Sequence, residues 1–182
     1  MQYGQFCPVA KATEIIGEKW TILILREILM GGSRFNELQR GLGLISPTVL
    51  TKRLNALEER GLVLKRRIKG QRGYEYLPTA SCKELLPVIR SLGEWGMRWA
   101  RTSLTETDYD VELLMLYLQR SVIPENLPGN QTIVRFRFTD IEDMSRWWLL
   151  VDGDDVDVCI TDPGMDVDVY FTTSVQTMAG IW

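Results

Sequence analysis

The amino-acid sequence predicts an α+β fold in two parts: helices and a β-hairpin in residues 1–103, and a helix followed by an antiparallel sheet in residues 104–182. Two observations predict this division. Apolar residues recur mostly at helical spacing in the first part, but at the two-residue spacing of strands from Gln131 onward. The charge also changes sign, because residues 1–103 hold 17 Lys/Arg and 9 Asp/Glu whereas residues 104–182 hold 4 Lys/Arg and 15 Asp/Glu. This asymmetry indicates a basic module that binds a polyanion and a separate acidic module.

Three helices are predicted in the first 42 residues. Residues 9–30 contain two of them, with Gly17 at the break. The second, "TILILREILM", is apolar nearly all round and is predicted to be the central buried helix. "GGSR" ends it, and "RFNELQRGL" forms a short helix that buries Phe35, Leu38 and Leu42.

The fourth helix begins at a strong start signal, because Ser46 is a favoured N-cap residue and Pro47 is accepted at the first helical position. It ends at Gly61. Three leucines share one face and are predicted to pack in the core: Leu50, Leu54 and Leu57. The opposite face carries short hydrogen-bonding side chains and one lysine: Thr48, Thr51, Lys52 and Asn55.

A β-hairpin is predicted next, from strands "LVLKRRI" and "YEYLP" around the turn "KGQRG". Five cations and no acid lie within eight positions: Lys65, Arg66, Arg67, Lys69 and Arg72. Each element alone is explained as a solvated surface. Together, in this order, they make a winged helix-turn-helix, whose recognition helix contacts base edges while the wing contacts phosphates. We therefore predict that the first part binds nucleic acid.

The candidate DNA-contacting residues lie before the recognition helix, along it and on the wing. They are Arg34, Asn36, Ser46, Pro47, Thr48, Thr51, Lys52, Arg53, Asn55, Lys65, Arg66, Arg67, Lys69 and Arg72. Arg53 points sideways on the helix, so we interpret it as a phosphate or intradomain contact and not as a base reader.

A further helix is predicted over residues 82–101, with a continuous apolar stripe: Leu85, Ile89, Leu92, Trp95 and Trp99. The second part then contains the helix "VELLMLYLQR" and a meander of about four strands with hairpin-like turns at "DGDD" and "DPGM". Val156, Val158 and Ile160 are predicted to share one strand face. "SVQTMAGIW" starts another helix. So little helix leaves the sheet unfinished, to be completed by a partner subunit or by a longer sequence.

Several classes of function are disfavoured by composition. The chain has no histidine, which removes Ser-His-Asp and Cys-His catalysis and histidine-based metal sites. It has no CxxC motif, and its acidic run lacks the spacing of an EF-hand loop. We expect no enzyme activity, no metal and no cofactor. Three scattered cysteines, no signal peptide and no long apolar segment favour a cytoplasmic protein without a membrane span.

The stretch from Phe6 to Arg67 resembles the HxlR-type winged-helix transcriptional regulators, relatives of the MarR regulators, and the resemblance covers about residues 6–101. The resemblance lies in Gly17-x-Lys19-Trp20, Arg34-Phe35-x-Glu37-Leu38, Ile45-Ser46-Pro47 and Leu50-Thr51-x-Arg53-Leu54. The wing departs from the family pattern, since its tip has no proline and Cys82 stands where a glycine is usual.

This resemblance implies a transcriptional regulator that binds a roughly palindromic double-stranded DNA operator as a homodimer. The dimer is formed by the N-terminal segment and the helix after the wing, which assigns the stripe from Leu85 to Trp99 to the dimer interface; packing within one chain is the alternative. Cys7 falls where some family members carry a cysteine that senses oxidants or electrophiles. A small buried thiol is the other interpretation of Cys7.

Residues 111–182 resemble the front part of sterol-carrier-protein-like domains, which enclose an apolar cavity, but they lack the closing helices of that family. The resemblance implies that an apolar small-molecule effector binds there and shifts DNA affinity. A dimerisation or stabilising appendage is the alternative. For the whole chain, the second hypothesis is a lipid-binding or interaction protein that uses the winged helix as a dimerisation scaffold.

Overall fold

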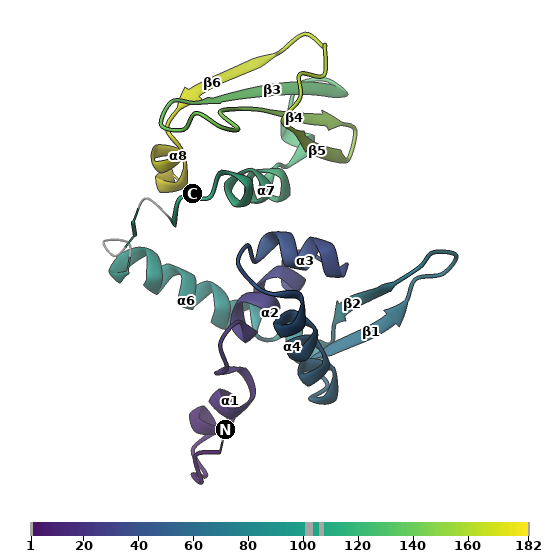
Figure 1. Ribbon diagram of the computed structural model, residues 1–182, viewed down its shortest axis with the longest axis vertical. Helices are drawn as coiled ribbons and strands as arrows, with labels where there is room; N and C mark the ends of the chain where they lie inside the picture. The colour runs from purple at the N-terminus through teal and green to yellow at the C-terminus, as the bar shows by residue number, and fades with distance from the viewer. Residues whose placement is uncertain (1, 101–103, 106–107, 182) are drawn as a thin grey trace. The chain divides into compact units, whose positions relative to one another are not determined.

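The computed structural model describes residues 2–100, 104–105 and 108–181. The chain forms two compact units, Met1–Thr102 and Ser103–Trp182. The sequence analysis places the boundary one residue later. Helices precede a sheet-containing region, as the predicted α+β class requires (Figure 1). Among the described residues, no helix is both long and apolar enough to cross a membrane.

The first unit contains the predicted helices and hairpin in the predicted order, except that the helix after the wing is divided in two. They are α1 (Pro8–Ile16), α2 (Thr21–Leu29), α3 (Phe35–Gly41), α4 (Pro47–Glu59), β1 (Val63–Arg67), β2 (Tyr74–Pro78), α5 (Ala80–Lys83) and α6 (Leu86–Trp99). Helix α2 lies at the centre, and its Ile24, Leu25 and Ile28 are buried with the leucines of α4. The β1–β2 hairpin extends away from the helices (Figure 1).

The helix expected over residues 82–101 is two helices, α5 and α6. Pro87 lies in the first turn of α6 and has no N–H to continue the hydrogen-bond ladder from α5, so the helix restarts there. The expected end of this helix at Arg101 lies outside the described residues. The break between α1 and α2 is confirmed: Gly17 caps α1, and Trp20 has a left-handed backbone before α2.

The second unit is a four-stranded sheet with helices on one side (Figure 1). Its elements are α7 (Val111–Ser121), the 3₁₀ turn η3 (Pro124–Asn126), β3 (Gln131–Phe138), β4 (Arg146–Asp152), β5 (Asp155–Cys159), β6 (Val169–Thr173) and α8 (Val175–Ile181). The strand order is β5-β4-β3-β6. Val134, Phe136 and Leu149 form the core with α7.

The predicted meander is wrong at its last strand. The "DGDD" turn does join β4 to β5 as an antiparallel hairpin, but β6 pairs parallel with β3. The chain after β5 crosses the sheet, so "DPGM" is not a hairpin turn. Asp168 fastens this crossover, because its carboxylate accepts the N–H of Ile133 at 2.8 Å and its N–H donates to the Ile133 carbonyl at 2.9 Å. Alternation predicts which side chains face the core, but not which strand is the neighbour.

The predicted strand face from Val156 to Ile160 is correct only in part. Val156 and Val158 pack on the core, whereas Ile160 lies past the end of β5 and is 55% exposed. The face of a side chain follows the alternation only while the strand continues.

Candidate nucleic-acid interface

Helix α4 presents the polar face that its sequence predicts. The Ser46 hydroxyl accepts the N–H of Val49 at 3.3 Å and caps the helix. Its three core leucines are buried: Leu50, Leu54 and Leu57. The residues on the other face are all exposed: Thr48, Thr51, Lys52 and Asn55. The helix therefore offers one continuous polar surface.

Thr51 is restricted in what it can contact. Its hydroxyl donates to the Pro47 carbonyl at 2.8 Å, so the proton is already used inside the helix. The oxygen keeps its acceptor capacity and the methyl group is free for apolar contact. Within the described residues, no hydrogen bond or ion pair engages the side chains of Lys52 and Asn55, which leaves both free to meet a ligand.

Arg53 has the intradomain role that was one of its two interpretations. Its guanidinium forms an ion pair with Glu18, and Nε donates to the Lys19 carbonyl at 3.1 Å. Arg60 acts similarly at the end of α4, donating to the Glu14 carbonyl at 2.6 Å. Both arginines fasten α4 to the segment around α1, so Arg53 is not available as a free cation for phosphate.

The wing carries cations of two kinds. Arg66 is paired, since its Nε donates to Glu75 at 2.7 Å, and this contact holds the pKa of Arg66 above its ordinary value. Lys65 lies over the ring of Tyr74, with Nζ 4.8 Å from the centroid. The other three are exposed, and in the part of the chain that the structure describes no hydrogen bond or ion pair engages them: Arg67, Lys69 and Arg72. These three are the free positive charges of the wing.

The segment that begins α3 is tied to the wing by Arg34, a candidate residue, and by partners that sequence reasoning did not select. The Arg34 guanidinium donates to Gln71 Oε1 at 3.0 Å, and the Tyr76 N–H donates to the Ser33 carbonyl at 2.7 Å. Arg34 also forms an isolated bridge with Glu75. Glu75 could have been found from the hairpin register, which sets it opposite Arg66. Nothing local predicted Gln71, because its partner lies 37 positions away.

Glu37 caps the start of α3. It accepts the N–H groups of Ser33 and Arg34 at 2.9 and 3.0 Å. Burial raises the pKa of Glu37, but the two N–H groups and the charge of Arg34 lower it more, so the net pKa lies below its ordinary value. The carboxylate thereby holds the segment that leads to Arg34 and Asn36, both of which are exposed.

The stripe predicted as a dimer interface divides into two parts. Leu85 and Ile89 pack against the core of their own unit. Leu92, Trp95 and Trp99 are 48%, 58% and 66% exposed. Val88, one turn before Leu92, is also exposed and was missed, although its spacing signals it. Phe6 and Val9, at the start of the chain, are exposed as well.

The cysteines differ in their surroundings. Cys7 is half-buried at the N-cap of α1, and Lys11, one turn further along α1, is ion-paired with Glu14 at 3.0 Å. Cys82 is fully buried, and burial raises the pKa of its thiol. Burial and then Asp157 raise the pKa of Cys159.

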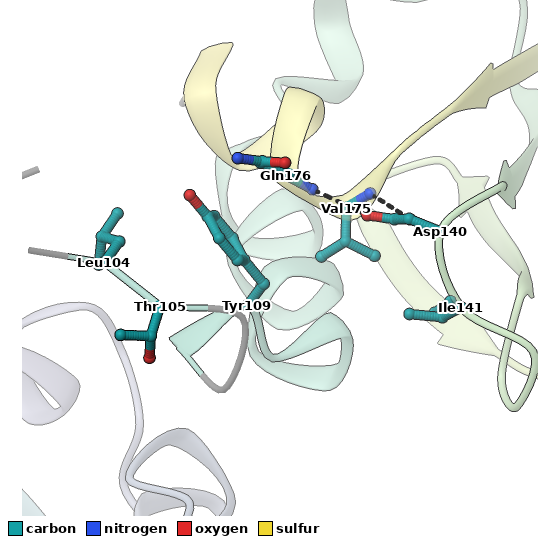
Figure 2. A pocket seen from close by; sticks show the side chains of 7 residues that line it. All are labelled: Leu104, Thr105, Tyr109, Asp140, Ile141, Val175 and Gln176. Carbon is teal, nitrogen blue, oxygen red and sulfur yellow. Dashed lines mark hydrogen bonds between the residues drawn. The ribbon is translucent and has the colours of Figure 1, made fainter. Parts of the chain in front are cut away.

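The described residues of the second unit line at least two cavities. One, of about 360 Å³, is mostly apolar, opens to solvent beside the sheet and is lined by residues that include Leu118, Leu127, Phe136 and Phe171. The other, of about 480 Å³, lies around Tyr109 and Asp140 (Figure 2).

Asp140 is not free in the second cavity. Figure 2 shows its carboxylate on the N–H groups of Val175 and Gln176, at 2.8 and 3.3 Å. Across the described ranges, no cluster of three or more Cys, Asp or Glu residues could hold a metal ion.

The fold and the α4–wing surface define a winged helix-turn-helix protein. Residues 15–104 match the family described as HxlR-like helix-turn-helix. The uncharacterized HTH-type transcriptional regulator YvaP of Bacillus subtilis is 32% identical over 109 residues, which are 58% of this chain and 100% of YvaP. The chain therefore belongs to the HxlR-like helix-turn-helix family.

Two other similarities cover the same part of the chain. The uncharacterized HTH-type transcriptional regulator Rv3095 of Mycobacterium tuberculosis is 40% identical over 89 residues, 48% of this chain and 56% of that protein. The chain thus spans little more than half the length of this relative. The crystal structure of PA1607, named as a candidate transcription factor, matches this chain with a TM-score of 0.50 and 31% sequence identity. The match covers 53% of this chain and 67% of the PA1607 chain. The family match ends at residue 104, so the resemblance of the acidic unit to sterol-carrier-protein-like domains stays a hypothesis.

Proposed function

We propose that the chain is a transcriptional regulator that binds double-stranded DNA through α4 and the β1–β2 wing. One observation carries this proposal: the capped helix α4 has an exposed polar face, and the hairpin that follows it presents three unengaged cations. A helix of this kind fits the major groove, and cations on a hairpin fit the phosphates beside it. The transcriptional regulators to which the chain is similar support the same assignment.

The contacts separate by chemistry. Thr48, Thr51, Lys52 and Asn55 are the proposed base readers, because their side chains are exposed on α4. Thr51 would act through its hydroxyl oxygen and its methyl group, since its hydroxyl proton is used inside the helix. The free wing cations bind phosphate and carry no sequence information. Arg53 leaves the set of DNA contacts, since it is engaged with Glu18 and Lys19.

A homodimer would bring two α4 helices to one operator. The exposed apolar residues of α6, Leu92, Trp95 and Trp99, support this proposal, because solvent-exposed tryptophans on one helix face are typical of an interface. Two-fold symmetry would place the recognition helices about 34 Å apart, or one turn of DNA, on a roughly palindromic site.

Genome-wide capture of DNA bound by the full chain tests the proposal. We expect enrichment at discrete sites that share a two-fold sequence pattern. The variant Lys52→Ala with Asn55→Ala should lose this enrichment, while Lys83→Ala, which removes an exposed cation on α5, should keep it. A uniform capture profile for the unmodified chain would contradict the assignment.

The apolar cavity supports a second role. We propose that an apolar small molecule binds in the cavity near Phe136 and Phe171 and changes DNA affinity, because that site has the size and lining of a small-molecule pocket. Titration of the DNA-bound protein with acyl and aromatic compounds tests this role. Ligand binding without any DNA binding would favour the alternative, a lipid-binding protein with the winged helix as scaffold.

Cys7 is the proposed site of redox modulation. Cys7 lies at the N-cap of α1 and is only partly buried, so an oxidant or electrophile can reach its sulfur. Alkylation should weaken DNA binding of the full chain but leave Cys7→Ser unaffected. Equal affinity before and after alkylation of Cys7 would remove this role.

A further inference from the structure

Helix α4 is held along one flank by two arginines that lie outside its polar face. Arg53 and Arg60 are about two helical turns apart, so both side chains leave α4 on the same side, between the buried leucines and the exposed polar face. Arg53 pairs with Glu18 and donates to the Lys19 carbonyl at 3.1 Å. Arg60 donates to the Glu14 carbonyl at 2.6 Å. Both arginines therefore connect α4 to the end of α1 and to the turn that follows it.

The turn that Arg53 contacts is a rigid support. The Thr21 N–H donates to the Glu18 carbonyl at 3.0 Å, which joins the turn to the buried helix α2. Trp20 has a φ of 78°, a left-handed conformation that a bulky residue keeps only where its surroundings enforce it. The bond from Arg53 to the carbonyl just before Trp20 is one such constraint. Helix α4 is thus attached to the central helix of the core and not to a flexible loop.

The two arginines restrict a motion that the core leucines restrict less. Leu50, Leu54 and Leu57 form one stripe, which fixes the depth of α4 on the core more firmly than its roll about that stripe. A roll of about 10° would move side-chain tips that lie about 6 Å from the helix axis by about 1 Å. Hydrogen bonds to base edges weaken steeply over such a displacement. The space enclosed beside Arg53 and Arg60 is about 10 Å³, room for one water molecule at most, so this flank is closely packed against roll.

We propose that Glu18 and Arg53 are positioning residues for base reading. Their ion pair sets the roll of α4, and thereby determines how well the protein distinguishes its operator from other DNA. Neither side chain touches a base, and both act through the exposed polar face of α4. The inference rests on the proposed DNA-binding function and extends it to residues that lie outside the DNA-contacting surface.

A positioning pair differs in its effects from a phosphate contact and from a contact that only stabilises the fold. Loss of a phosphate contact flattens the salt dependence of binding by about 0.9 in slope. Loss of folded protein lowers the affinities for operator and for other DNA by the same factor, so their ratio stays unchanged. A misplaced reading helix loses base contacts but keeps the phosphate contacts of the wing, so the affinity for the operator falls selectively.

Fluorescence anisotropy of the full chain tests the proposal, with an operator duplex from the genome-wide capture and a duplex of scrambled sequence. Arg53→Met keeps the aliphatic stem and removes the guanidinium. Its ratio of operator affinity to scrambled affinity should fall about tenfold, the loss of roughly one base contact. Its affinity for the scrambled duplex should stay within about twofold of that of the unmodified chain, with the same salt slope. Glu18→Gln should lower the ratio by less, because Arg53 keeps its bond to the Lys19 carbonyl.

Two further variants separate the pair from its neighbours. Glu58→Gln removes an exposed acid from the other flank of α4, with the same change of charge as Glu18→Gln, and should leave the ratio unchanged. The double variant Glu18→Gln with Arg53→Met should lose no more discrimination than Arg53→Met alone, because the two residues act as a unit. Glu18→Gln, the milder change, provides the measurement if Arg53→Met does not fold.

The outcomes distinguish this inference from the function on which it rests. Equal binding of both duplexes by the unmodified chain would contradict the DNA-reading function and the positioning role together. If the unmodified chain does discriminate, an unchanged ratio in Arg53→Met and in Glu18→Gln overturns the positioning role alone. A salt slope that flattens by about 0.9 in Arg53→Met would make Arg53 a phosphate contact instead. Additive losses from Glu18→Gln and Arg53→Met would show that the two residues do not act as a pair, which also overturns the proposal.

Discussion

The salt dependence of DNA binding should report the free cations of the wing one by one. Each phosphate contact contributes about 0.9 to the slope of log affinity against log salt concentration. Arg67, Lys69 and Arg72 are exposed and unengaged among the described residues. Replacing all three by glutamine should therefore flatten the slope by about 2.7, and each single replacement by about 0.9.

Arg66 should behave differently from its neighbours, because Glu75 already balances its charge at 2.7 Å. Arg66→Gln should change the slope by less than Arg67→Gln. The measurement is fluorescence anisotropy with one operator duplex between about 50 and 200 mM salt. Each lost phosphate contact should reduce the ratio of the affinity at the lower salt concentration to that at the higher one by about 3.5-fold. Lys83→Gln is the control away from the wing. A slope for the triple variant equal to that of the unmodified chain would refute the phosphate-binding role of the wing.

Three further predictions concern stability. Gly41→Ala should lower the free energy of unfolding by about 1–3 kcal/mol, because the new methyl group would collide with the buried Glu27 carboxylate. Gly93→Ala is the matched control: it has open space around it and should stabilise α6. Denaturant unfolding compares the two variants. Ser46→Ala should cost about 1 kcal/mol in the same assay through loss of the α4 cap, and an unchanged unfolding midpoint would show that the cap contributes nothing. The pKa of Glu37 is lowered in the folded state, so its contribution to the free energy of unfolding is present above the ordinary pKa of 4.5 and is lost as pH falls through the folded pKa. The stability of Glu37→Gln should therefore fall less steeply in acid than that of the unmodified chain. Identical profiles of unfolding free energy against pH would contradict this.

Local signals were enough for the first unit. Ser46-Pro47 predicted the start of α4, and the spacing of its leucines predicted the face that packs inward, because both depend on neighbours within a few positions. The glycines of "KGQRG" located the wing turn between β1 and β2 for the same reason. The predicted site was less complete. Arg53 is engaged with Glu18, 35 positions earlier, and helical spacing cannot reveal such a contact.

The sequence by itself determined most of the secondary-structure elements, the two-part charge division and the polar face of α4, since each follows from residue type and periodicity along one segment. Only the tertiary structure showed which wing cations are free and which half of the α6 stripe is exposed. It also showed that the chain after β5 crosses the sheet, so that β6 lies parallel to β3. These depend on contacts between distant segments. A strand's alternation makes one face apolar but is the same for every neighbour it could pair with, so the parallel pairing of β6 with β3 becomes visible only once the sheet is assembled.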